Sequence, residues 1–142
     1  MNRYLLVLFL LAFAKALTAQ TVIGVWKTID DETQEPKSYV EIYEEDGEIK
    51  GRVHKILADY PQDSVCINCE DERKNKPVLG MVILEGMSYD EDGEYDGGII
   101  LDPENGKEYR CKIWLDEDNP DILHVRGYVA FFYRTQQWIR VR

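Results

Sequence analysis

Apolar and polar side chains alternate along most of this chain, with the period of two that is typical of a β-strand. The clearest example is residues 98–115, where an apolar run ends in Asp-Pro-Glu-Asn-Gly and an alternating run follows. Pro103 presets φ for a turn, and Gly106 accepts a positive φ without steric cost. Tyr109 and Cys111 fall on the same face of the second run. This stretch therefore predicts a β-hairpin.

The same pattern predicts further short strands, which are separated by acidic turns that carry glycine or proline. Besides the hairpin, we expect strands at residues 22–29, 38–43, 48–57, 78–84, 122–132 and 136–142. Gly51 inside one of these strands indicates a bulge or a close approach of a neighbour. Residues 58–77 lack a clear period and form the longest expected loop. The pattern predicts an all-β fold: a single antiparallel up-and-down β-barrel of about eight strands, whose closure removes exposed edges.

The first twenty residues differ in kind from the rest. Arg3 gives the start a positive charge, residues 5–13 are apolar, and small residues follow up to Ala19. This order is typical of a secretory signal peptide, and the apolar run is shorter than the roughly 20 residues that span a bilayer. We expect a signal peptide at residues 1–19, a barrel domain at 20–142 and a periplasmic or secreted protein with no membrane span after leader removal. An uncleaved N-terminal anchor is the alternative.

The charge is strongly acidic. The 142 residues contain 17 basic and 27 acidic side chains, for a net charge of −10. Leader removal takes away two basic residues, Arg3 and Lys15, and no acidic one, so the net charge becomes −12. Such a chain is repelled by nucleic acid and by anionic membrane surfaces, and we expect it to bind no nucleic acid.

Cys66 and Cys69 form the sharpest local motif, a CxxC in the long loop. Three interpretations compete: a local disulfide in an oxidising compartment, a redox pair, or a metal site completed by Cys111 and a histidine. Carboxylates flank the motif on both sides and disfavour the thiolate that redox chemistry needs. We therefore favour a structural Cys66–Cys69 disulfide, a free Cys111 and no metal.

The remaining polar residues suggest no catalytic centre. His54 and His124 are isolated on alternating strands, and no serine lies in a GxSxG context. The acidic turns do not match the spacing of a calcium loop. We accordingly predict no catalytic residue, no cofactor and no enzyme activity.

Tyrosines and tryptophans are spread over almost every predicted strand. In a small barrel they either fill the interior or, where one end stays open, line an apolar pocket with hydroxyl groups. The residues that we expect to line such a pocket are Tyr43, Tyr109, Trp114 and Tyr128.

Two resemblances add to this pattern. Gly24-x-Trp26 on the first strand, with Arg140 and Arg142 on the last, looks like the lipocalin and calycin arrangement, in which a late arginine crosses a first-strand tryptophan at the closed end. The resemblance implies barrel closure by Trp26 and Arg140, although Arg134 leaves open which arginine crosses the ring.

Nearly all of residues 22–142 also resembles a small exported bacterial family known as domain of unknown function 2147. The resemblance rests on short motifs that recur in that order, namely Gly24-Val25-Trp26, Glu41-Ile42-Tyr43, Cys66-x-x-Cys69, Lys76-Pro77-Val78-x-Gly80, Gly97-Gly98-x-Ile100-Leu101-Asp102-Pro103, Asn105-Gly106-Lys107-x-Tyr109-x-Cys111, Val125-Arg126-Gly127-Tyr128 and Arg134-Thr135-Gln136-x-Trp138. It implies export and a lipocalin-like barrel, and it adds no catalytic residue.

Three hypotheses of function follow. The first is an exported barrel that binds a small apolar or amphipathic molecule in its interior. The second is an interaction or structural module of the envelope, with a solid barrel and a protein partner. The third is a thiol redox protein that uses Cys66 and Cys69.

Overall fold

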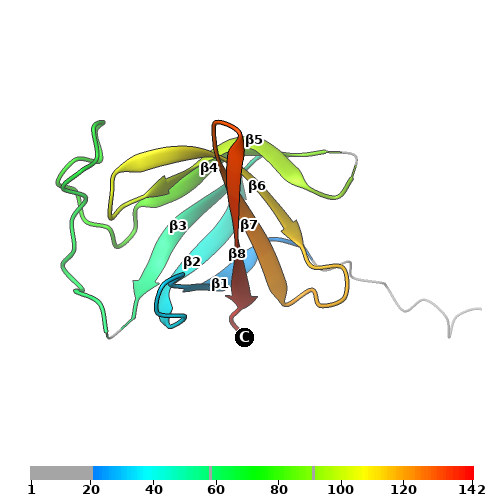
Figure 1. Cartoon of the computed structure of the whole chain (residues 1–142), viewed down its shortest axis with the longest axis horizontal. Coiled ribbons are helices and arrows are strands. Elements are labelled where there is room, and N and C mark those ends of the chain that lie inside the picture. Colours follow the sequence, from blue (N-terminus) through cyan, green and yellow to red (C-terminus); the bar gives the residue numbers. More distant parts are fainter. Residues whose placement is uncertain (1–20, 58, 91) are drawn as a thin grey trace, which may run out of the picture.

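Eight strands follow one another along the chain and close into one antiparallel barrel (Figure 1). The computed structural model describes residues 21–57, 59–90 and 92–142, so the predicted signal peptide at 1–19 lies outside the described residues. The strands are β1 Gly24–Ile29, β2 Pro36–Glu45, β3 Glu48–Ile56, β4 Val82–Tyr89, β5 Tyr95–Asp102, β6 Lys107–Leu115, β7 Ile122–Val129 and β8 Phe132–Arg140. Each strand pairs with the next, and β8 pairs with β1. The predicted all-β up-and-down barrel is thereby confirmed.

Several predicted strand boundaries are wrong. The strand expected at 136–142 is β8, which begins four residues earlier, at Phe132. The strand expected at 78–84 is β4, which begins only at Val82, because Gly80 adopts a left-handed φ of +84° and keeps the preceding residues in the loop. The strand expected at 122–132 ends at Val129, and the chain turns at Ala130 and Phe131 into β8. No glycine, asparagine or proline marks that turn, since Ala130 itself takes a left-handed φ of +52°.

Within the described residues no helix is long and apolar enough to cross a membrane.

The barrel interior is filled by side chains from every strand. Residues that alternate along the strands share one face, and paired residues on neighbouring strands share it too. The largest side chains with almost no exposed surface are Trp26, Trp138, Ile42, Leu84, Met87, Ile113, Leu123 and Val40. Burial of each such side chain is worth roughly 1.5–3 kcal/mol relative to exposure, so this cluster is the main source of stability.

Close packing between strands depends on two glycines of the inner face. A Cβ at Gly51 would lie 3.0 Å from Leu84 Cβ, and the pairing of β3 with β4 shifts register on both sides of Gly51. The bulge or close approach predicted at Gly51 is therefore confirmed. At Gly98 a Cβ would clash with the backbone of Glu85 and with Met87 Sδ. Glycine at these positions lets β3, β4 and β5 pack against one another without an interior gap.

The long loop between β3 and β4 lies along the outside of the barrel, where Figure 1 shows it as the green segment at the left. Arg73 links this loop to the barrel. Its guanidinium binds Asp71 within the loop, Glu108 on β6 and the carbonyl oxygen of Val82 on β4. The turn at Gly106 also contacts the loop, since a Cβ there would clash with the carbonyl of Asn68. The loop therefore covers the outer face of the sheet near β4, β5 and β6.

Candidate functional site

Side-chain contacts link neighbouring segments at both ends of the barrel. At one end Arg140 places its guanidinium carbon 4.3 Å from the centroid of the Trp26 ring. It also donates hydrogen bonds to the carbonyl oxygens of Ile23 at 3.2 Å, Thr21 at 2.8 Å and Pro120 at 3.1 Å. The structure thus places Arg140, and not Arg134, across the first-strand tryptophan.

At the opposite end a chain of polar contacts runs from the core to the loop after β1. Trp138 Nε1 donates to Gln136 Oε1 at 3.1 Å, and Gln136 Nε2 donates to Asp31 Oδ2 at 2.6 Å. Arg134 pairs with the same Asp31 carboxylate. Arg134 therefore helps to tie the β1–β2 loop across this end of the barrel.

The four tyrosines and tryptophans expected to line a pocket are not brought together. Tyr109 shares the inner face with Cys111, and its hydroxyl accepts a hydrogen bond from Asn105 Nδ2 at 3.1 Å. Tyr43, Trp114 and Tyr128 occupy the alternate, outward positions of their strands, each with an arginine against its ring. The aromatic side chains that fill the core are instead Trp26 and Trp138.

The Cys66–Cys69 disulfide forms as predicted, and Cys111 remains a buried free thiol. Cys66 is 0% exposed and Cys69 is 2% exposed, so the bond lies beneath the loop surface and a reductant or partner thiol cannot reach it directly. Burial, with a smaller contribution from the charge of Asp96, raises the pKa of the Cys111 thiol to about 12. Neither the disulfide nor the free thiol is placed for thiol chemistry.

Metal binding and acid–base chemistry have little structural support. Within the part of the chain that the structure describes, no group of three or more His, Cys, Asp or Glu side chains is arranged to hold a metal ion. His124 Nε2 lies 2.8 Å from Asp116 Oδ2 and its ring stacks on Trp114, with 5.1 Å between ring centroids. That contact lowers the pKa of the Asp116 carboxyl below its ordinary value, which suits a structural ion pair and not a general acid.

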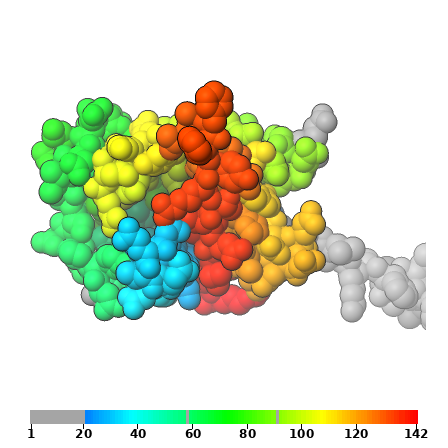
Figure 2. Space-filling model, in the orientation of Figure 1, coloured from blue at the N-terminus to red at the C-terminus, as the bar shows by residue number. Residues whose placement is uncertain are grey.

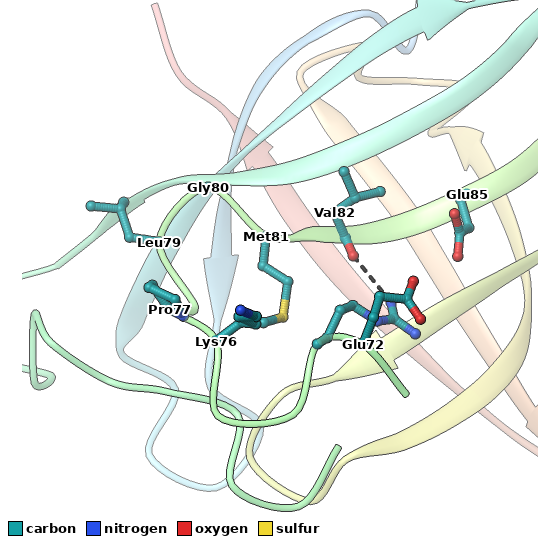
Figure 3. A pocket seen from close by; sticks show the side chains of 9 residues that line it. Glu72, Lys76, Pro77, Leu79, Gly80, Met81, Val82 and Glu85 are labelled. Atoms are coloured by element: carbon teal, nitrogen blue, oxygen red, sulfur yellow. Dashed lines mark hydrogen bonds between the residues drawn. The ribbon is translucent and has the colours of Figure 1, made fainter. Parts of the chain in front are cut away.

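A hollow of about 390 Å³ lies outside the barrel wall, between the long loop and β4 (Figure 3). Its apolar lining comes from Pro77, Leu79, Met81 and Val82. Charged side chains of Glu72, Arg73, Lys76 and Glu85 complete its wall, and Figure 3 shows Leu79 and Pro77 on one side with Glu72 and Glu85 on the other. This volume falls in the range of small-molecule sites, although the hollow is open to solvent.

Among the residues that the structure describes, the most exposed large apolar side chain lies on the β7–β8 hairpin. Phe131 is 99% exposed, Phe132 77%, Tyr133 61% and Val129 55%. Figure 2 shows the orange tip of this hairpin rising beyond the rest of the surface. Consecutive apolar residues on a projecting turn are costly for solubility, and such patches mark interaction sites. A polar Asn-Gly turn would suit the backbone better than Ala130-Phe131, so the tip is not explained by turn geometry.

The sequence pattern does not reveal these tip residues, because it predicts residues 122–132 as one strand. The available signal was Phe131-Phe132-Tyr133, in which three consecutive aromatic side chains break the alternation that a half-buried strand would keep.

An eight-stranded up-and-down barrel with an arginine across a first-strand tryptophan defines a lipocalin-like fold. The chain matches the model of a bacterial family of uncharacterised proteins, domain of unknown function 2147, over residues 24–140, and it belongs to that family. Among solved structures it is similar to protein HP1028 from the human pathogen Helicobacter pylori, which is described as belonging to the lipocalin family. That similarity has a TM-score of 0.72 with 18% sequence identity, and it covers 84% of this chain and 82% of the other. No curated protein matches the chain.

Proposed function

We propose that this protein is an exported, non-enzymatic binding module that holds its partner on the outside of a solid barrel, at the end where the β7–β8 hairpin projects. The single observation that carries the proposal is the contrast between a filled interior and an exposed apolar tip. Trp26 is 0% exposed and Trp138 2%, whereas Phe131 is 99% exposed. A carrier that binds inside its barrel would instead need open space in the interior and no large apolar patch outside it.

The filled interior weighs against an apolar ligand inside the barrel. Both ends are tied, by Arg140 at one end and by Asp31 with Gln136 at the other. A ligand of drug size needs roughly 300 Å³ or more, and interior close packing leaves voids much smaller than that. The burial of Cys66 and Cys69 likewise weighs against a redox protein.

Crosslinking from the tip tests the proposal. Phe131 would be replaced by the photoreactive p-benzoylphenylalanine, and the full chain would be irradiated in the cells that make it. Discrete adducts are expected from position 131 and none from Ile67, a matched position that is 66% exposed in the long loop. Equal adduct patterns from the two positions, or none from either, would refute docking through the hairpin.

A small-molecule carrier is the second candidate function, and the hollow beside β4 would be its ligand-binding site. Pro77, Leu79 and Val82 offer apolar contact there, while Lys76 offers a cation. Native mass spectrometry of the mature protein, without reducing agent, distinguishes the two functions. The binding module predicts a bare polypeptide that lacks two hydrogens for the disulfide. A reproducible extra mass that disappears on denaturation would favour the carrier.

A further inference from the structure

Two arginines beside the β7–β8 hairpin have no carboxylate partner, although the protein is strongly acidic. Among the described residues every other arginine forms an ion pair with Asp or Glu, namely Arg52, Arg73, Arg134, Arg140 and Arg142. Arg110 on β6 and Arg126 on β7 contact aromatic rings instead. In a chain with a net charge of −10, two arginines that form no ion pair mark this face as one that can meet an external anion.

Aromatic rings hold both guanidinium groups in place. Arg126 lies 4.2 Å from the centroid of the Tyr133 ring and 4.9 Å from that of Trp114, and its Nε donates to Thr135 Oγ1 at 2.8 Å. Arg110 lies 5.7 Å from the Tyr128 ring centroid. Stacking on rings leaves the outer N–H groups of a guanidinium free to bind a phosphate.

The hairpin therefore presents three kinds of side chain in a fixed order from its tip. Phe131 and Phe132 come first, followed by Tyr133 with its cross-strand partner Tyr128. The backbone of Arg126 lies two residues behind Tyr128 along β7, a distance of about 7 Å at roughly 3.3 Å per residue, and its guanidinium reaches forward to the Tyr133 ring. The headgroup region on each side of a bilayer is roughly 5–8 Å thick, so the same order of apolar, tyrosine and cationic groups fits one passage from acyl chains to phosphates.

We propose that the tip of the β7–β8 hairpin inserts into the surface of a zwitterionic phospholipid membrane. Phe131 and Phe132 enter the acyl region, Tyr128 and Tyr133 lie at the glycerol level, and Arg126, with Arg110, binds lipid phosphate. This inference rests on the proposed function, since it names the partner of the same docking end. A zwitterionic surface suits the protein because its acidic remainder would be repelled by an anionic one.

A second copy of the chain fits the same face less well. In a symmetric dimer each hairpin would meet its own copy, and the unpaired Arg110 and Arg126 of the two chains would be brought together. The carboxylates on this face, Glu94 and Asp116, are already paired with Lys112 and His124, so they do little to offset that repulsion. Phosphate groups offset it directly.

Flotation with vesicles of phosphatidylcholine and phosphatidylethanolamine tests the inference on the mature chain. The wild-type protein is expected to float with the vesicles, and Phe131→Ser is expected to weaken binding roughly tenfold, the worth of one buried phenylalanine. Ile67→Ser is the matched control and should bind like wild type. Arg126→Gln should weaken binding several-fold, whereas Arg142→Gln, at an exposed pair elsewhere, should leave it unchanged. Identical circular dichroism spectra would establish that every variant is folded.

Insertion depth provides a second measurement. Phe131→Trp keeps an aromatic tip, and its fluorescence should shift to the blue and be quenched by brominated acyl chains. Wild-type protein that stays off the vesicles, or a Phe131→Ser variant that floats equally well, would overturn the membrane inference. If Phe131 then still gives a discrete protein adduct or a dimer adduct on crosslinking, the docking function stands and only the lipid partner is wrong. If no adduct forms either, both proposals fail.

Discussion

Replacement of Arg140 by alanine should reveal how much the closed end of the barrel contributes to stability. The side chain is only 14% exposed. It gives hydrogen bonds to the carbonyl oxygens of Thr21, Ile23 and Pro120 and lies over the Trp26 ring. Arg140→Ala therefore strips the donor from three carbonyl oxygens and removes a partly desolvated cation–π contact in one step.

The expected loss is about 3–5 kcal/mol. Hydrogen bonds from a charged donor are worth about 1.5–3 kcal/mol each, and a desolvated cation–π contact about 2 kcal/mol. Water can reach some of the freed carbonyl oxygens at the rim, so the total should fall below the simple sum and near the cost of breaking a buried ion pair. For a domain with about 5–15 kcal/mol of stability, this is a large fraction.

Arg142→Ala is the matched control. Arg140 Nε lies 3.4 Å from Asp121 Oδ1, and Arg142 binds the same carboxylate at 2.7 Å while its own side chain is 70% exposed. An exposed pair of this kind is worth about 1 kcal/mol or less. Urea unfolding, followed by tryptophan fluorescence, measures both variants, and the midpoint should fall without a change of slope. If Arg140→Ala cost no more than Arg142→Ala, the interpretation of Arg140 as the closing residue of the barrel would be wrong.

Three further predictions concern the cysteines and the long loop. Native Cys111 should not react with a thiol reagent at pH 8, because burial raises the pKa of its thiol to about 12. It should react fully once urea unfolds the chain. Fast labelling of the native protein would contradict the buried position of this thiol. The double substitution of Cys66 and Cys69 by serine should lower the free energy of unfolding by about 2 kcal/mol, as expected for so short a closed loop. The far-ultraviolet circular dichroism spectrum of the barrel should not change. Loss of that spectrum would show that the barrel needs the disulfide to fold. Arg73 lowers the pKa of Asp71, so the stabilisation by this carboxylate is present above its ordinary pKa of about 4 and is lost as pH falls through the lowered value. Asp71→Asn should therefore lower the urea midpoint at pH 7 and approach wild type in acid, and an equal deficit at both pH values would refute the ion-pair explanation.

The barrel could be predicted from the sequence because each strand carries its own alternation and most turns carry their own glycine or proline. The hairpin around Gly106 shows this, since Asp102-Pro103-Glu104-Asn105-Gly106 forms the turn between β5 and β6 where expected. Trp26 and Arg140 could be paired only through a resemblance, because no local pattern joins residues so far apart in the chain.

The docking end could not be predicted in the same way. Alternation assigns a face relative to one strand, but it does not say which strand ends project beyond the barrel, and that depends on the register of all eight strands. Tyr43, Trp114 and Tyr128 therefore looked like pocket residues, although register places them outside. The turn at Ala130 was hidden because an alanine in a left-handed conformation leaves no mark in composition.

The seam between the first and last strands has a kinetic consequence. β1 and β8 pair only at Trp26 with Arg140 and at Lys27 with Ile139, while every other junction in the barrel joins strands that are neighbours in sequence. Arg140 and Ile23 are 117 positions apart, so this junction carries the largest loop-closure entropy of any strand pairing. The other seven junctions join strands that follow one another in sequence, most of them through short turns, so we expect the β1–β8 pairing to form last. Just before the barrel closes, a folding molecule would thus be an open, curved sheet whose two free edges are β1 and β8.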